Sequence, residues 1–237
     1  MNNKVGAITF SYSTSMDAKN IAIILEDSSG LVNNEWVLST FDPDLVSVIK
    51  NSSNETMEKN IKNWMDLPKN VNNVLAMIGQ TSEIEDLWHK CVGNQVISFL
   101  EYLYQKPFDF NNISAYATSA PMCDDNPKEN EFFFISKNSY RQTWNTTGIN
   151  LWRKHSLSVI AHELNHFMFY KYYGDLEKTL SASQFLTLKE SLIFFSDPAS
   201  TGYAIERPLR DFYLSLDRNR HSLDEIIKLA VAKLLNQ

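Results

Sequence analysis

The segment SLSVIAHELNHFMFYKYYG, residues 156–174, places two histidines four positions apart, with a glutamate directly after the first. On a helix, positions i and i+4 lie one above the other on the same face, so His162 and His166 can direct their imidazoles at a common point. Zinc accepts neutral imidazole nitrogen, and three protein ligands leave a fourth position for a water molecule of lowered pKa. Glu163 is then placed to take the proton of that water. The spacing predicts a metal site that does chemistry.

The same segment has the pattern of a helix that packs on a core. Its apolar residues recur at helical spacing and form one stripe, namely Leu157, Ile160, Ala161, Leu164 and Met168. Such a stripe holds a helix against its neighbours. We expect the opposite face, with the two histidines and Glu163, to line a cleft. Gly174 is a typical helix end, so the predicted helix covers residues 156–173.

The ten residues VIAHELNHFM, 159–168, resemble the active-site helix of zincin metallopeptidases. The resemblance implies a zinc-dependent peptidase in which His162 and His166 are ligands and Glu163 is the general base. The metzincin pattern requires Gly at position 169 and His at position 172, where this chain has Phe169 and Tyr172. That group is excluded. The gluzincin arrangement, in which a glutamate on a second, downstream helix is the third ligand, agrees with the sequence.

Glu190, on a predicted helix over residues 183–195, is the candidate for that third ligand. His166 lies eight residues before Gly174, and Glu190 lies eight residues after Ala182. At 1.5 Å per residue, each is about 12 Å from its end of the connecting loop. Two helices folded back on each other therefore bring the carboxylate level with the second histidine.

The surroundings of Glu190 leave one alternative and one open question. It could be a solvated glutamate beside Lys189, but apolar residues three or four positions away predict an apolar face, where an unpaired carboxylate is costly. Gluzincins often carry an Asp four residues after this glutamate to support a ligating histidine, and here that position is Phe194. Asp197 is a weaker substitute, so the sequence does not identify the residue that hydrogen-bonds to a ligating histidine.

Other candidates for the site rank lower. Glu177 follows the first helix too closely to fold back easily. Peptide deformylases also use two histidines in this spacing with an upstream cysteine ligand, but PMCDDN around Cys123 does not resemble their motif. The sequence does not decide whether His221 or a tyrosine stabilises the transition state.

The remaining chain predicts an α+β fold. Residues 42–104 have helical patterns, 113–119 and 131–136 read as two short antiparallel strands, and 222–235 reads as a helix opened by a Ser222/Glu225 capping box. No linker divides the chain. We expect one zincin-like domain over residues 1–237, with a mostly helical amino-terminal portion (1–106) and a catalytic core (107–237).

The aromatic run at residues 132–136 has two interpretations. Such a run is most often buried core. In zincin folds, however, an edge strand ahead of the active-site helix pairs with extended substrate, and this segment has the corresponding position in the chain.

The amino-acid composition argues against several classes of binding partner. The net charge of −6 and the 43% apolar content describe a globular chain with no broad basic surface, which argues against nucleic acid and anionic lipid as partners. No apolar run of about 18 residues and no leader pattern occur, and two cysteines are too few for a disulfide framework. We expect a cytoplasmic protein that acts on a peptide or protein and contacts no membrane.

Three classes of function follow from these observations. The first is a zinc-dependent metallopeptidase. The second is a catalytically silent domain that binds zinc or a peptide, although Glu163 argues against a purely structural site, which four protein ligands normally close. The third is a metal-free helical interaction protein whose motif is accidental.

Overall fold

Helices dominate the structure, a computed structural model that describes residues 4–26, 33–123, 125–135, 149–195, 207–216 and 221–236. With a small mixed sheet they form an α+β fold, which confirms the predicted fold class at this level. The α-helices are α1 (Thr14–Glu26), α2 (Asn34–Ser39), α3 (Pro43–Lys50), α4 (Asn54–Met65), α5 (Val71–Leu87), α6 (Gly93–Tyr104), α7 (Ile149–Tyr173), α8 (Ala182–Ser191), α9 (Arg207–Ser215) and α10 (Leu223–Leu235). The strands are β1 (Ile8–Ser11), β2 (Ile113–Thr118), β3 (Asp125–Asn126) and β4 (Glu131–Ile135). None of the helices described is both long enough and apolar enough to cross a bilayer.

The chain groups into two compact units, and helix α7 has its first half in one and its second half in the other. Unit 1 contains Met1–Gly93 and Phe110–Ile160, and unit 2 contains Asn94–Asp109 and Ala161–Gln237. The sequence division at residues 106 and 107 is therefore not the division into units. A single domain over residues 1–237 stays a prediction.

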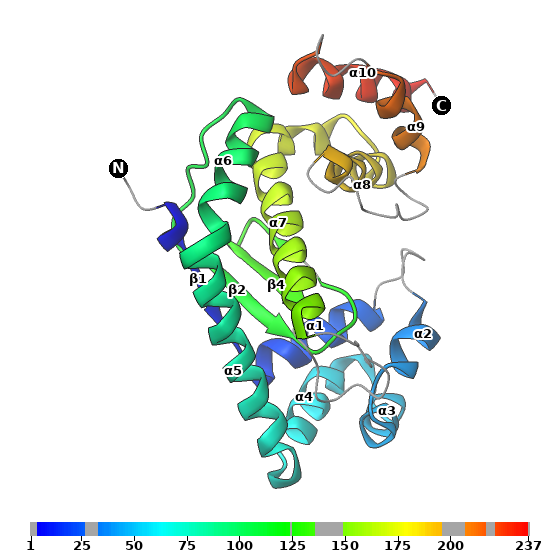
Figure 1. The fold of residues 1–237 in the computed structure, drawn as a ribbon. Coiled ribbons are helices and arrows are strands. Elements are labelled where there is room, and N and C mark those ends of the chain that lie inside the picture. Colours follow the sequence, from blue (N-terminus) through cyan, green and yellow to red (C-terminus); the bar gives the residue numbers. More distant parts are fainter. Residues whose placement is uncertain are drawn as a thin grey trace. The chain divides into compact units, whose positions relative to one another are not determined.

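Unit 1 holds the whole sheet, in the order β1-β2-β4-β3 (Figure 1). Strand β2 pairs in parallel with β1, where Ile8 lies opposite Ile113, and in parallel with β4, where Ser114 lies opposite Glu131. Among the strand pairs that the structure describes, β3 and β4 alone are antiparallel. The prediction that residues 113–119 and 131–136 form an antiparallel pair was therefore wrong.

The cause of this error lies in the polar loop between the two strands. Residues 125 and 126 form the short strand β3, and a turn over residues 127–130 reverses the chain into β4. Asn130 ends that turn in the left-handed region, with φ of 55°, a conformation that asparagine tolerates better than most residues. Because the chain reverses once before β3 and once after it, β4 runs in the same direction as β2.

The aromatic residues of β4 are buried. Phe132, Phe133 and Phe134 are all 2% exposed or less, and Phe134 contacts the ring of Phe10 on β1 edge-on. These residues therefore belong to the core, as the more common interpretation has it. Strand β3 pairs with β4 at Glu131 and Phe132 only, so the alternative that this segment pairs with extended substrate stays a hypothesis. Ser136, the last residue of the predicted strand, lies outside the described residues.

A buried carboxylate joins helix α1 to the end of strand β2. Asp17 is 0% exposed, and its Oδ1 accepts hydrogen bonds from the Thr118 hydroxyl (2.8 Å) and the Ser119 backbone N–H (2.7 Å). The Tyr12 hydroxyl donates to Oδ2 at 3.2 Å. Burial raises the pKa of Asp17 above its usual 3.8, although these hydrogen bonds act in the opposite direction.

We expect Asp17→Asn to remove a pH dependence of stability. A carboxyl with a raised pKa in the folded protein binds more protons than the unfolded chain does, so its contribution to stability falls as the pH rises from 3.8 through the raised value. Urea unfolding of both proteins from pH 4 to pH 7 should show wild type losing stability relative to Asp17→Asn. A difference that is constant over this range would contradict the prediction.

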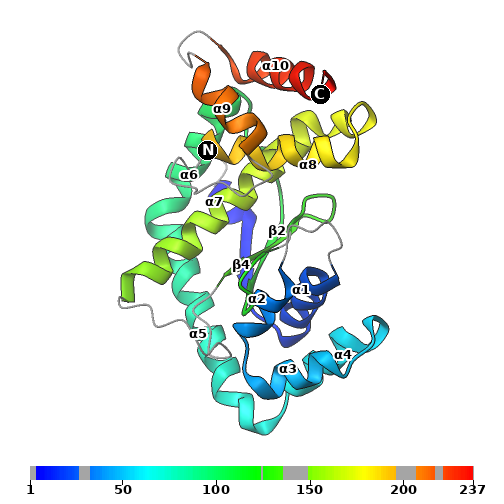
Figure 2. The same cartoon turned by 90° about the vertical axis from the view of Figure 1, so that its right-hand side faces the viewer.

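Unit 2 consists of helices, with α6, the second half of α7, α8, α9 and α10 (Figures 1 and 2). Ser222 caps α10 by accepting from the backbone N–H of Glu225 at 3.3 Å, while the Glu225 carboxylate accepts from the Ser222 N–H at 2.8 Å. This confirms the predicted capping box. Helix α8 has the same motif at Ser181, which accepts from the N–H of Gln184 at 3.3 Å.

Two helix boundaries differ from the sequence prediction. Helix α7 begins at Ile149 rather than at residue 156, because Ser156 does not cap a helix and instead donates its hydroxyl to the carbonyl of Ile135 at 2.5 Å. Helix α8 ends at Ser191 and continues as a 3₁₀ turn over Leu192–Phe195. Such a tightened last turn is common at helix ends.

Candidate metal centre

The second half of helix α7, which carries the motif, is held by contacts within unit 2. Residues 163–169 of α7 are all buried, so the exposed opposite face expected from the apolar stripe is confined to the neighbourhood of His162. Within the motif, the side-chain oxygen of Asn165 accepts a hydrogen bond from the hydroxyl of Tyr104 on α6. Both residues are 2% exposed or less. This buried bond fixes α7 against α6 at the level of the two histidines.

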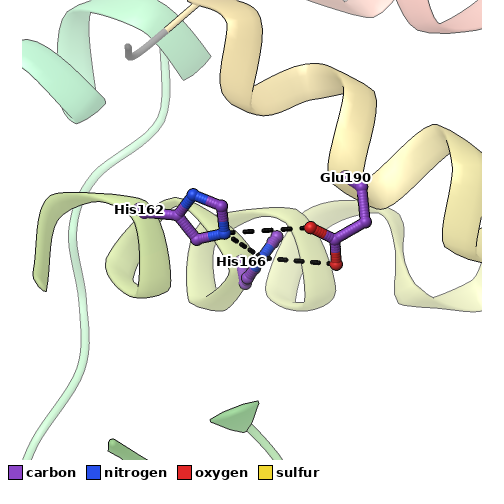
Figure 3. A group of neighbouring side chains, drawn as sticks. All are labelled: His162, His166 and Glu190. Carbon is purple, nitrogen blue, oxygen red and sulfur yellow. Dashed lines mark hydrogen bonds and ion pairs between the residues drawn. The ribbon is translucent and has the colours of Figure 1, made fainter. Parts of the chain in front are cut away.

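Three donor atoms face one another between α7 and α8 (Figure 3). The Nε2 atoms of His162 and His166 are 3.0 Å apart. Across from them, Glu190 on α8 directs one oxygen at each ring: Oε2 is 3.8 Å from Nε2 of His162, and Oε1 is 3.6 Å from Nε2 of His166. The structure therefore brings together the three residues that the sequence selected as metal ligands.

The spacing of the three side chains is of the size that a small tetrahedral cation requires. Zinc bonds of about 2.0–2.1 Å at tetrahedral angles place neighbouring ligand atoms about 3.3 Å apart. The two histidine nitrogens are 3.0 Å apart, and the carboxylate oxygen of Glu190 that faces each ring lies 3.8 Å from His162 and 3.6 Å from His166. The two contacts with Glu190 are too long for ordinary N–H···O hydrogen bonds, which lie at about 2.7–3.2 Å. Two imidazoles and one carboxylate are also the donor set of a catalytic zinc site with one open position.

Exposure is unequal around the three ligands. The side chain of His166 is 2% exposed, whereas those of Glu190 and His162 are 17% and 25% exposed. A water molecule or substrate group can thus approach at His162 and Glu190. Glu163 is 5% exposed, and one of its carboxylate oxygens lies within 4.8 Å of a ring nitrogen of His166. The candidate general base is therefore beside the candidate ligands.

The charge of Glu190 is balanced by its neighbours. Burial alone would raise the pKa of this carboxyl, but its interactions with His166, Lys189 and His162 outweigh burial and hold the pKa well below its usual range. Glu190 is therefore ionised at neutral pH. An ionised carboxylate is the form that binds a metal ion.

The support of His166 differs from the usual pattern for ligating histidines. A histidine that binds metal through Nε2 normally donates its Nδ1–H to an acceptor. The Nδ1 of His166 is buried, and no residue of the described ranges forms a hydrogen bond with it. Asp197, the substitute considered from the sequence, lies outside the described residues.

The structure also places the lower-ranked candidates. Glu177 is exposed in the 3₁₀ segment Gly174–Lys178, and Cys123 is half-buried in unit 1. His221 directly precedes the cap of α10 and lowers the pKa of Glu225 through its charge, although less than the hydrogen bonds from Ser222 do.

Sequence reasoning missed Lys189 and Tyr104. The sequence interpretation named Lys189 only as the neighbour of Glu190, yet it is 7% exposed. No sequence signal marks either residue, because a lysine is rarely buried and Tyr104 is distant from the motif in the chain.

Comparisons with protein-family models, with curated proteins and with solved structures returned no match for this chain. The functional argument therefore depends on the motif and on the geometry above.

We expect Glu190→Gln to weaken zinc binding strongly. The amide keeps the shape of the side chain but removes the anionic ligand, so the loss should exceed the roughly 10–100-fold typical of an outer-shell partner. The matched control is Glu177→Gln, at an exposed position of the same unit. Isothermal titration of both variants with zinc measures the effect. Equal affinities would mean that a residue other than Glu190 is the third ligand.

Proposed function

We propose that this chain is a zinc-dependent metallopeptidase of the zincin type, with a gluzincin-like ligand set of His162, His166 and Glu190. The observation that carries the proposal is the convergence of the His162, His166 and Glu190 side chains, one ligand atom of each lying within 4.8 Å of the others, beside Glu163. Supporting evidence is the partial exposure of His162 and Glu190, because a catalytic metal needs one position that a reactant can reach.

Each residue has a separate role in the proposed reaction. When bound, zinc supplies Lewis acidity, which polarises a scissile carbonyl and lowers the pKa of water. Glu163 receives the proton from the attacking water and passes it to the leaving amine. The hydrogen bond from Tyr104 to Asn165 fixes the position of α7 relative to α6, so the histidines and Glu163 would hold their positions during the reaction.

We propose a peptide or protein as the substrate. The net charge of −6 favours neither nucleic acid nor an anionic membrane as a partner. We also propose that the protein acts in the cytoplasm, because its two cysteines are too few for the disulfide framework of an exported domain.

The first test of the proposal is metal content. We expect one tightly bound zinc per chain, because two imidazoles and a carboxylate match its ligand preferences. Native mass spectrometry of protein purified without a His tag and without added zinc measures this directly. Protein that carries no metal and takes up none on titration at neutral pH would exclude the proposed function.

The second test separates catalysis from binding. Glu163→Gln should retain zinc and fold but lose about 10²–10⁴-fold in hydrolysis rate, because the amide keeps the shape of the side chain and cannot accept the proton. A cleavable peptide is first found by incubating wild type with a peptide library and identifying the fragments by mass spectrometry.

Two results would count against this assignment. If wild type binds zinc but cleaves no peptide, the alternative of a silent zinc-binding or peptide-binding domain is favoured. If Glu163→Gln cleaves as fast as wild type and a chelator stops both, Glu163 is not the base.

A further inference from the structure

A buried lysine lies beside the proposed third ligand. Lys189 on α8 is 7% exposed, and its Nζ is 3.4 Å from Oε1 of Glu190. Lysine is almost never buried to this degree unless it is paired. The same oxygen is also the one that faces Nε2 of His166, at 3.6 Å. Oε1 of Glu190 therefore has a fixed cation and a candidate metal ligand as neighbours.

The surroundings strengthen this ion pair. The Lys189 Nζ is 5.7 Å from the centre of the Tyr170 ring, within the range of a cation–π contact. Tyr170 in turn contacts Phe185 at 5.6 Å between ring centres, and Lys189 itself is 7% exposed. Charges removed from water in this way interact more strongly than charges on an exposed surface.

We infer that Lys189 is a positioning residue, the counter-ion of Glu190 in the metal-free protein, and that it competes with the metal for the same carboxylate. The inference rests on the proposed metal centre. Without metal, Lys189 compensates the negative charge of a carboxylate that is only 17% exposed. With metal, the ammonium repels a dication bound to the oxygen beside it. Lys189 thus stabilises the metal-free state and weakens metal binding.

This role of Lys189 would make the metal at the proposed centre exchangeable. Two imidazoles and one carboxylate would hold zinc more tightly in the absence of Lys189, so the lysine keeps the metal exchangeable. It also keeps the protein folded when the metal has left, because Glu190 retains a partner. A lysine that served only as packing would affect the metal-free and the zinc-loaded states equally.

The test is Lys189→Met, which keeps most of the length of the side chain and removes its charge. We expect zinc affinity to rise by about tenfold or more, because the repulsion is lost. We also expect the thermal midpoint of the metal-free protein to fall, so the increase in midpoint on adding zinc becomes larger than in wild type. Affinity is measured by competition with a chromophoric chelator, and midpoints by circular dichroism.

Three further variants complete the design. Lys189→Arg keeps the charge and should restore wild-type affinity, and Lys189→Gln provides a second neutral variant if the methionine does not fold. Lys178→Met removes a lysine whose Nζ is 2.6 Å from Asp175 in an exposed pair of the same unit, and should leave zinc affinity unchanged.

The outcomes separate the inference from the proposed function. Wild type that binds no zinc excludes the metal centre and the inference with it. Wild type that binds zinc, together with neutral variants of equal affinity, overturns the inference alone and assigns Lys189 to packing. Neutral variants of lower affinity also overturn it, because Lys189 would then support the ligand rather than compete with the metal.

Discussion

The structure of unit 2 depends on a carboxylate held between two imidazoles and a lysine. Burying Glu190 near an apolar helix pair costs free energy unless its charge is compensated, and Lys189, His162 and His166 provide that compensation. The pairing places α8 beside α7, with Glu190 facing the two histidines (Figure 3). The fold of this unit and the proposed metal centre thus share one constraint.

The helix that bears the histidines is fixed by contacts within the same unit. Tyr104 donates to Asn165, one turn from His162 and adjacent to His166. Near the end of the helix, the hydroxyl of Tyr172 donates to the carbonyl of Pro107 at 2.6 Å, and that of Tyr173 donates to Asp224 in α10. A metal site needs its ligands placed to within a fraction of an ångström, and a helix anchored at several heights can satisfy that requirement.

The described residues provide a partly built outer shell. Glu190 has Lys189 as a neighbour, while no residue of the described ranges accepts a hydrogen bond from Nδ1 of His166. Metal centres are tuned by such partners, which orient each ligand and set its charge. A cation next to the carboxylate reduces the charge that the ligand offers to a metal. In the proposed centre, electrostatics as well as ligand type would therefore determine metal binding.

The local parts of this arrangement follow from sequence alone. The spacing of His162 and His166 fixes their relation on any helix, because the period of 3.6 residues is a property of the backbone. The capping box at Ser222 is likewise a matter of neighbouring residues, and it was predicted correctly. The proximity of Glu190 to His166 could also be derived from the sequence, because both residues lie eight positions from their end of the loop that connects the two helices.

Tertiary structure decided what depends on distant chain segments. The parallel pairing of β2 and β4 could not be read from alternation of residues, because alternation specifies a strand but not its direction, and the two-residue strand β3 reversed the chain once more. The burial of Lys189 and the bond from Tyr104 to Asn165 likewise arise only when helices meet. Sequence determined which groups can do chemistry, whereas the fold decided which charges lie beside them, because electrostatic neighbours are set by distance in space and not along the chain.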